Sequence, residues 1–172
     1  MKKKFDSKSF ALSAVMAALM VVLVYLSSLF PVMSLSIVAI AGVLSAILVS
    51  ECGVSYACLA YISASALMLI TAPDKSNAVL FVLLFGIYPI IAVILERVKH
   101  KMFTCVLKLL VANVLFFITL MFFRLLMFVE IGDKAGIFWF VWIVYNVIFV
   151  MYDVCLKKLV IFYRIRIGKH IR

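Results

Sequence analysis

Charged and amide side chains inside long apolar runs are the candidates for chemical function in this sequence. Arg124 lies a turn or two inside the end of a run over about residues 105–129, and Asn146 lies deep in the next run. Such side chains are costly in hydrocarbon, so each is a candidate for contact with a ligand or with another helix. For Arg124 the alternatives are an ion pair with Glu130 and snorkelling outward along its own stem.

Aromatic residues surround Asn146 in the sequence. Trp139, Trp142 and Tyr145 combine rigid apolar rings with polar tips, a mixture typical of small-molecule pockets. An interfacial aromatic belt is the alternative for the two tryptophans. The sequence therefore predicts a substrate-binding set of Arg124, Trp139, Trp142, Tyr145 and Asn146.

Other polar residues in the apolar runs have ordinary structural explanations. We expect Lys108 to snorkel to the cytoplasmic end of its run and Asn113 to join two helices by a hydrogen bond. Glu96 and Asp153 lie near basic residues at the same end, which favours ion pairs with partners such as Lys157.

Catalytic and nucleotide-binding motifs are missing from the sequence. It contains no G-x-x-x-x-G-K-[ST] and no G-x-G-x-x-G, and both histidines, His100 and His170, lie in basic flanks. The four cysteines lack metal-ligand spacing and are expected to be reduced thiols. We therefore expect no enzyme activity, catalytic residue, metal or cofactor, and no nucleic-acid partner.

We expect these residues to lie on membrane helices. The chain has 172 residues, of which 69% are hydrophobic, and a soluble domain is nearer half apolar. A bilayer core needs about 20 apolar residues per helix. The sequence predicts an all-α polytopic integral membrane protein in which one transmembrane domain has six helices. These spans are expected at about residues 10–30, 32–50, 54–72, 78–95, 105–129 and 137–155, followed by a basic tail at 156–172.

The distribution of basic residues predicts the orientation. Of the 17 Lys and Arg residues, 13 lie in the N-terminal segment, the link between the fourth and fifth spans, and the tail, whereas the opposite loops hold only Lys75 and Lys134. Positive charge accumulates on the cytoplasmic side. We expect a plasma-membrane protein with both termini in the cytoplasm and an uncleaved first helix. Within the fourth span, Gly86 and Pro89 predict a kink.

The two halves of the chain differ in side-chain size. Residues 10–72 hold 24 Gly, Ala or Ser and 5 aromatics, whereas residues 78–163 hold 7 and 18. Small residues permit close helix contact, and Ala11, Ala14 and Ala18 share one face of the first span. Either the small-residue half packs within the chain and the aromatics face lipid, or the first half docks a partner and the second half encloses a ligand.

The six-helix plan, the alanine-rich start Ala11-Leu12-Ser13-Ala14-Val15-Met16-Ala17-Ala18 and the aromatic second half resemble the substrate-binding S components of energy-coupling-factor transporters. The stretch from Leu84 to Ile91 with Glu96-Arg97 is also similar to uncharacterised small membrane proteins of Gram-positive bacteria. The S-component resemblance implies docking of a transmembrane coupling subunit on the A-x-x-x-A face of Ala14 and Ala18, extended by Ala11. It also implies separate ATPases and a vitamin-like ligand held on the outer side by the last three helices.

Two functions follow as expectations. The first is a subunit that captures a small, vitamin-like molecule for an uptake transporter in the lipid bilayer. The alternative is a scaffold that transports nothing and binds or assembles another membrane protein.

Overall fold

The computed structural model describes residues 7–96, 101–126 and 135–166, and these residues are helical with no strand. Six helical stretches within them are long and apolar enough to cross a bilayer, as the sequence predicts. They are α1 (Ser7–Leu29), α2 (Ser34–Glu51) preceded by the 3₁₀ turn η1 (Pro31–Met33), α3 (Val54–Thr71), a composite stretch of α4 (Lys75–Leu80), η2 (Phe81–Gly86) and α5 (Ile87–Leu95), α6 (Lys101–Leu126) and α7 (Ala135–Arg166).

The last helix is longer than its sequence suggests. We expected the sixth span to end near residue 155, but α7 continues to Arg166, so Lys157 and Lys158 lie on the helix. Lysines can lie on a helix near the edge of the membrane, because their long aliphatic stems let the ammonium groups reach polar surroundings.

Short links with specific capping contacts connect the first four spans. Gly53 joins α2 to α3 with a φ of 93°, a conformation that glycine adopts without steric cost. Asp74 caps α4 by accepting a hydrogen bond of 2.9 Å from the Ser76 amide. The Lys75 ammonium donates to the Leu69 and Ile70 carbonyl oxygens at the end of α3. These contacts satisfy backbone groups that a helix end leaves unpaired.

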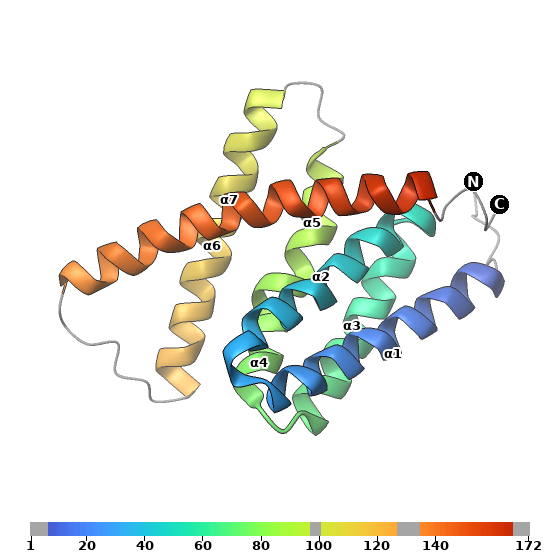
Figure 1. Cartoon of the computed structure of the whole chain (residues 1–172), viewed down its shortest axis with the longest axis horizontal. Coiled ribbons are helices and arrows are strands. Elements are labelled where there is room, and N and C mark those ends of the chain that lie inside the picture. Colours follow the sequence, from blue (N-terminus) through green and yellow to red (C-terminus); the bar gives the residue numbers. More distant parts are fainter. Residues whose placement is uncertain (1–6, 97–100, 127–134, 167–172) are drawn as a thin grey trace.

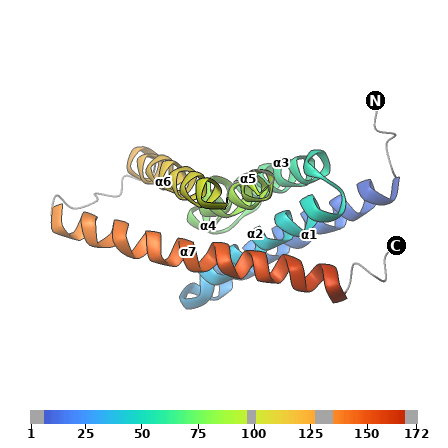
Figure 2. The same cartoon turned by 90° about the horizontal axis from the view of Figure 1, so that it is seen from above.

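Helix α2 lies at the centre of the molecule and packs against α1, α3, η2, α5 and α7. Figure 1 shows α7 crossing α6 and α5 steeply, and the start of α1 on the same side as the end of α7. Seen from above, α1, α2 and α7 form one layer, and α3, α5 and α6 form the other (Figure 2). The candidate site lies between the two layers, where α7 crosses α5 and α6.

The difference in side-chain size between the two halves appears in two separate cores. The larger core joins α1, α2 and α3 to the composite span through small residues such as Ala41, Ala60 and Ala64. The smaller core joins α5, α6 and α7 through Tyr88 and Phe149, with the aromatic side chains of neighbouring residues around them. Small residues let the first three helices approach closely, whereas the last helices are held apart by rings.

A π-helical segment, η2, occupies the part of the fourth span where a kink was expected. Pro89 has no N–H to donate to the carbonyl of Phe85 four residues earlier. That carbonyl oxygen lies so close to Gly42 of α2 that a Cβ at position 42 would collide with it. Tyr61 Oη donates a hydrogen bond of 2.7 Å to the Val82 carbonyl oxygen. Neighbouring helices thus accommodate the irregular backbone.

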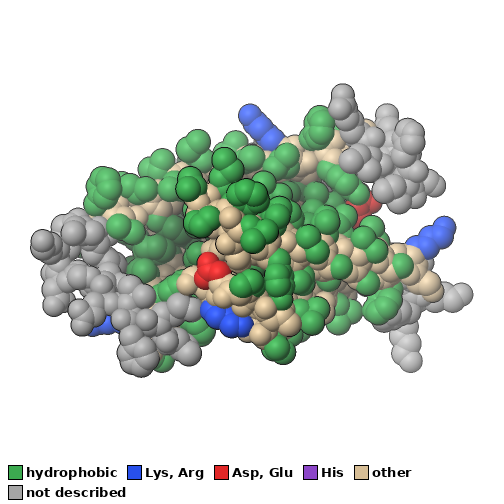
Figure 3. All heavy atoms as spheres, turned by 60° about the horizontal axis from the view of Figure 1, so that its bottom comes forward, with side chains coloured by type: hydrophobic (Ala, Val, Ile, Leu, Met, Phe, Trp, Pro, Cys, Tyr) green, Lys and Arg blue, Asp and Glu red, His purple; other side chains and the backbone are tan. Residues whose placement is uncertain are grey.

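The outer surface is apolar over most of its area. Figure 3 shows one face covered largely by hydrophobic side chains, with charged side chains at a few places. Large exposed hydrophobic residues occur along α1, α6 and α7, among them Val22, Val106 and Ile143. A surface of this kind is stable against lipid hydrocarbon and not against water.

Candidate functional site

A cavity of about 330 Å³ lies where α7 crosses α5 and α6. Its size is in the range of small-molecule sites in proteins. The lining residues come from α2, the composite fourth span, α6 and α7, so the cavity exists only when these helices are assembled. They are Leu35, Leu80, Leu84, Phe85, Tyr88, Phe116, Thr119, Leu120, Phe123, Val141, Val144, Tyr145, Ile148, Phe149 and Tyr152.

Ring contacts fix the aromatic walls of the cavity. Phe116 of α6 stacks on Tyr145 of α7, with ring centroids 4.2 Å apart. Tyr88 of α5 meets Phe149 of α7 edge to face at 4.4 Å. Such ring pairs contribute about 0.5–1.5 kcal/mol each beyond the burial of their area. The walls are therefore held in position by contacts between the helices.

The hydroxyl groups of the lining residues are directed at the protein. Thr119 Oγ1 donates to the Leu115 carbonyl oxygen at 2.8 Å, and Tyr145 Oη donates to the Ala112 carbonyl oxygen at 3.0 Å. Tyr88 Oη donates to Asp153 Oδ1 at 2.7 Å, and Tyr152 Oη lies 3.4 Å from the Ala39 carbonyl oxygen. The cavity consequently presents a hydrocarbon and aromatic surface to an occupant.

The structure separates the five residues predicted to bind substrate. Tyr145 lines the cavity, as a site residue would. Trp142 and Asn146 do not line it, because their polar groups join α7 to Asn113 of α6. Trp142 Nε1 donates to Asn113 Oδ1 at 2.7 Å, and Asn113 Nδ2 donates to Asn146 Oδ1 at 3.0 Å. The helix-joining role predicted for Asn113 is confirmed, and it extends to Asn146 and Trp142.

The remaining two predicted residues lie outside the cavity lining. The side chain of Trp139 is exposed and its ring meets Trp142 edge to face at 5.7 Å. Arg124 is exposed near the end of α6. Glu130, the alternative ion-pair partner predicted for Arg124, lies outside the described residues. In the sequence, Arg124 directly follows Phe123, the last residue of α6 that lines the cavity.

The prediction that Lys108 snorkels to the membrane surface is wrong. We expected its side chain to snorkel to the membrane surface, but it is 3% exposed and holds an ion pair with Glu96 at 2.8 Å and another with Asp153 at 3.0 Å. Lys108 lies seven residues after the start of α6, which is roughly 10 Å along the helix. Carboxylates on α7 and at the end of α5 are within reach of the ammonium, so the charge is paired inside the protein.

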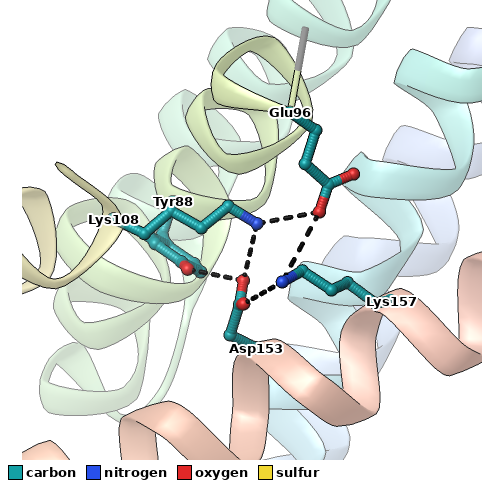
Figure 4. Close-up of polar contacts among 5 residues, drawn as sticks. All are labelled: Tyr88, Glu96, Lys108, Asp153 and Lys157. Atoms are coloured by element: carbon teal, nitrogen blue, oxygen red, sulfur yellow. Dashed lines mark hydrogen bonds and ion pairs between the residues drawn. The ribbon is translucent and has the colours of Figure 1, made fainter. Parts of the chain in front are cut away.

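Four charged residues form a closed quartet, shown in Figure 4: Glu96, Lys108, Asp153 and Lys157. Lys157 Nζ lies 2.8 Å from Asp153 Oδ2 and 3.9 Å from Glu96 Oε1, which confirms the predicted pairing of these carboxylates with Lys157. Two cations alternate with two carboxylates, so their charges balance. A balanced, hydrogen-bonded arrangement is the condition under which charges persist away from water.

Tyr88 connects the ion quartet to the cavity. Its ring lines the cavity, and its hydroxyl donates to the Asp153 carboxylate. Sequence reasoning missed this connection, because Tyr88, Lys108 and Asp153 lie on three helices that are distant in the sequence. The available signal was the lysine placed well inside a span together with two acidic residues at span ends.

The predicted docking face of α1 points away from the bundle. Ala11, Ala14 and Ala18 are exposed, whereas Ser13, Ala17 and Met20 form the buried face. The chain therefore divides its small residues between an internal packing surface and an outward face of α1.

Comparison with protein-family models, with curated proteins and with solved structures gives no match to this chain. Its class is consequently defined by its own architecture. It is a multi-pass membrane protein whose described residues form six helical stretches long and apolar enough to cross a bilayer, with a hydrophobic cavity among the last of them.

Proposed function

We propose that this chain is the small-molecule-capturing subunit of a membrane transporter, located in the plasma membrane with both termini in the cytoplasm. The observation that carries the proposal is the apolar cavity of about 330 Å³ between α5, α6 and α7. Its walls come from four separate spans. Ring contacts between helices hold these walls in position, and the hydroxyl groups of the lining residues donate hydrogen bonds to acceptors of the protein itself. A preformed cavity of this kind suits ligand capture, because little ordering is required on binding.

Energy for uptake would come from partner proteins, since the sequence carries no nucleotide-binding motif. A transmembrane coupling subunit with ATPases is the partner that the resemblance to S components implies. The exposed alanine face of α1, with Ala11, Ala14 and Ala18, supports this part of the proposal, because small side chains allow a second helix to approach closely.

The direct test is identification of the molecules that purify with the protein, by mass spectrometry of the wild-type chain and of Val144→Phe. Val144 lines the cavity, so a phenyl ring there occupies the ligand's volume. Val150→Phe is the matched control, since Val150 is an exposed residue of α7 that is not among the lining residues. We expect a small molecule in the wild type and in Val150→Phe that Val144→Phe lacks.

Thermal unfolding provides the second measurement. A ligand at a hundredfold excess over its Kd stabilises a protein by about 2.7 kcal/mol, so re-adding the identified molecule should raise the Tm of the wild type and not of Val144→Phe. Identical bound molecules in the wild type and Val144→Phe would contradict capture in this cavity.

A membrane scaffold is the second candidate function, and the outward alanine face of α1 favours it as well. In a scaffold, Ala14→Leu and Ala18→Leu would abolish association with a membrane partner, and no metabolite would stabilise the chain. Because both alanines are exposed, neither leucine should overpack the chain alone. Loss of folding in the absence of a partner would exclude a docking role for this face.

A further inference from the structure

The chemistry of the cavity wall restricts what the cavity can hold. All four hydroxyl-bearing lining residues, Thr119, Tyr145, Tyr88 and Tyr152, direct their hydroxyls to acceptors of the protein. These residues leave a cavity surface that is almost entirely apolar, so polar groups of a ligand there would lose more hydrogen bonds to water than they could replace. The part of the ligand inside the cavity is therefore hydrocarbon.

The cavity is open toward the apolar outer surface of the protein. Its lining residues Val141, Val144 and Ile148 are themselves 45%, 37% and 49% exposed. They share one face of α7, and the neighbouring residues Ile143 and Val147 of the same helix are also exposed. Because this surface faces bilayer hydrocarbon, an occupant can enter from the membrane without crossing water.

One cationic side chain lies at the edge of this apolar space. On α6, the lining residues Phe116 and Leu120 are spaced by four, and the next position of that series is Arg124. Residues four apart lie on the same side of a helix, one turn above the other. Arg124, which is exposed, therefore follows the last lining residues of α6, one turn after Leu120 and directly after Phe123. A guanidinium binds a carboxylate through two parallel hydrogen bonds.

We propose that the cavity binds a single-chain fatty acid, with the hydrocarbon chain between α6 and α7 and the carboxylate at Arg124. This inference rests on the proposed capture function and assigns its ligand class. The apolar wall accommodates the chain, and the charge of Arg124 selects an acidic head over a neutral one. The ligand class proposed here is therefore an amphiphile that reaches the site through the bilayer, and not the vitamin-like molecule that the sequence resemblance implies.

Photo-crosslinking of the full chain in nanodiscs of dioleoylphosphatidylcholine tests the proposal. The probes are palmitic acid with a diazirine in mid-chain and the corresponding alcohol, and mass spectrometry locates the labelled residues. We expect the acid to label lining residues of α6 and α7 and to be displaced by unlabelled palmitic acid. Val144→Phe and Ile148→Phe should each abolish this labelling, whereas Val150→Phe should retain it. Thermal unfolding identifies the folded variants.

Arg124→Gln separates head selection from chain binding. It should lower labelling by the acid about tenfold, the effect of losing one charge-assisted contact, and leave labelling by the alcohol unchanged. Arg124→Lys should retain part of the preference, and Lys158→Gln, which removes an exposed charge from α7, should have no effect. If the acid and the alcohol label the wild type equally and Arg124→Gln has no effect, the assignment of a fatty acid is overturned. Binding of a hydrocarbon chain in the cavity would still stand. Unchanged labelling in folded Val144→Phe and Ile148→Phe would overturn cavity binding as well.

Discussion

Replacement of Lys108 by methionine tests the ion quartet, in which the Lys108 side chain is buried. Methionine matches the length and apolar character of the lysine stem, so the change removes the ammonium while keeping most of the packing. It leaves Asp153 and Glu96 with Lys157 as their remaining cation in the quartet. The expected effect is a loss of stability, because the two carboxylates then share one cation that is itself 43% exposed.

The magnitude follows from the burial of each partner. Breaking a buried ion pair by removing one member costs about 3–5 kcal/mol. The Glu96 side chain is 41% exposed and can regain water, whereas the Asp153 side chain is 14% exposed and keeps the hydrogen bond from Tyr88. Both features reduce the penalty, so we expect a loss of about 3 kcal/mol, the lower end of that range.

The assay is SDS-driven unfolding in mixed micelles, followed by tryptophan fluorescence. Trp142 reports directly, because its indole N–H bonds across the α6–α7 interface. Lys158→Met is the control, since Lys158 is exposed on α7 and should change stability by less than about 0.5 kcal/mol. A double-mutant cycle of Lys108→Met with Asp153→Asn should show a coupling of about 1–3 kcal/mol.

The competing explanation is that Lys108 reaches the membrane surface on its own. In that case Lys108→Met would cost no more than Lys158→Met, and the cycle with Asp153→Asn would show no coupling. Either of these results would refute the quartet as a source of stability.

Three further changes test the packing and the topology. Gly42→Ala should destabilise the protein by about 1–3 kcal/mol or prevent its accumulation, because the new methyl group meets the Phe85 backbone oxygen; expression level and Tm measure this. Asn113→Ala and Asn146→Ala should each cost about 0.6–1.7 kcal/mol, the range for hydrogen bonds between membrane helices, and their double mutant should lose less than the sum of the two. In a cysteine-free background, a cysteine at position 75 should react with an impermeant maleimide on intact cells and one at position 99 only after permeabilisation; labelling of position 99 from outside would reverse the proposed orientation.

Hydrophobicity and turn chemistry are local properties, so they could be predicted from the sequence. The six apolar stretches predicted from the sequence are of this kind. The turn at Gly53 and the cap at Asp74, which the structure shows, also depend on neighbouring residues. The pairing of Asn113 with another helix could also be anticipated, because an amide in hydrocarbon requires a hydrogen-bonding partner. Pro89 indicated an irregularity in the fourth span, and the structure shows a π-helical segment next to Gly42.

The cavity and the quartet depend on how distant helices cross, which neighbouring residues do not determine. The direction in which α7 crosses α5 and α6 turned Tyr145 toward the cavity and Asn146 toward Asn113, although these residues are adjacent in the sequence. The same crossing brought Asp153 within 3.0 Å of Lys108 and made a buried ion pair of a lysine that the sequence placed at the membrane surface. Which residues must avoid water and which need polar partners follows from the sequence, because these requirements belong to single side chains. Which partner each residue has depends on how the helices are arranged, because the energy of an ion pair or a ring contact depends on distances between helices.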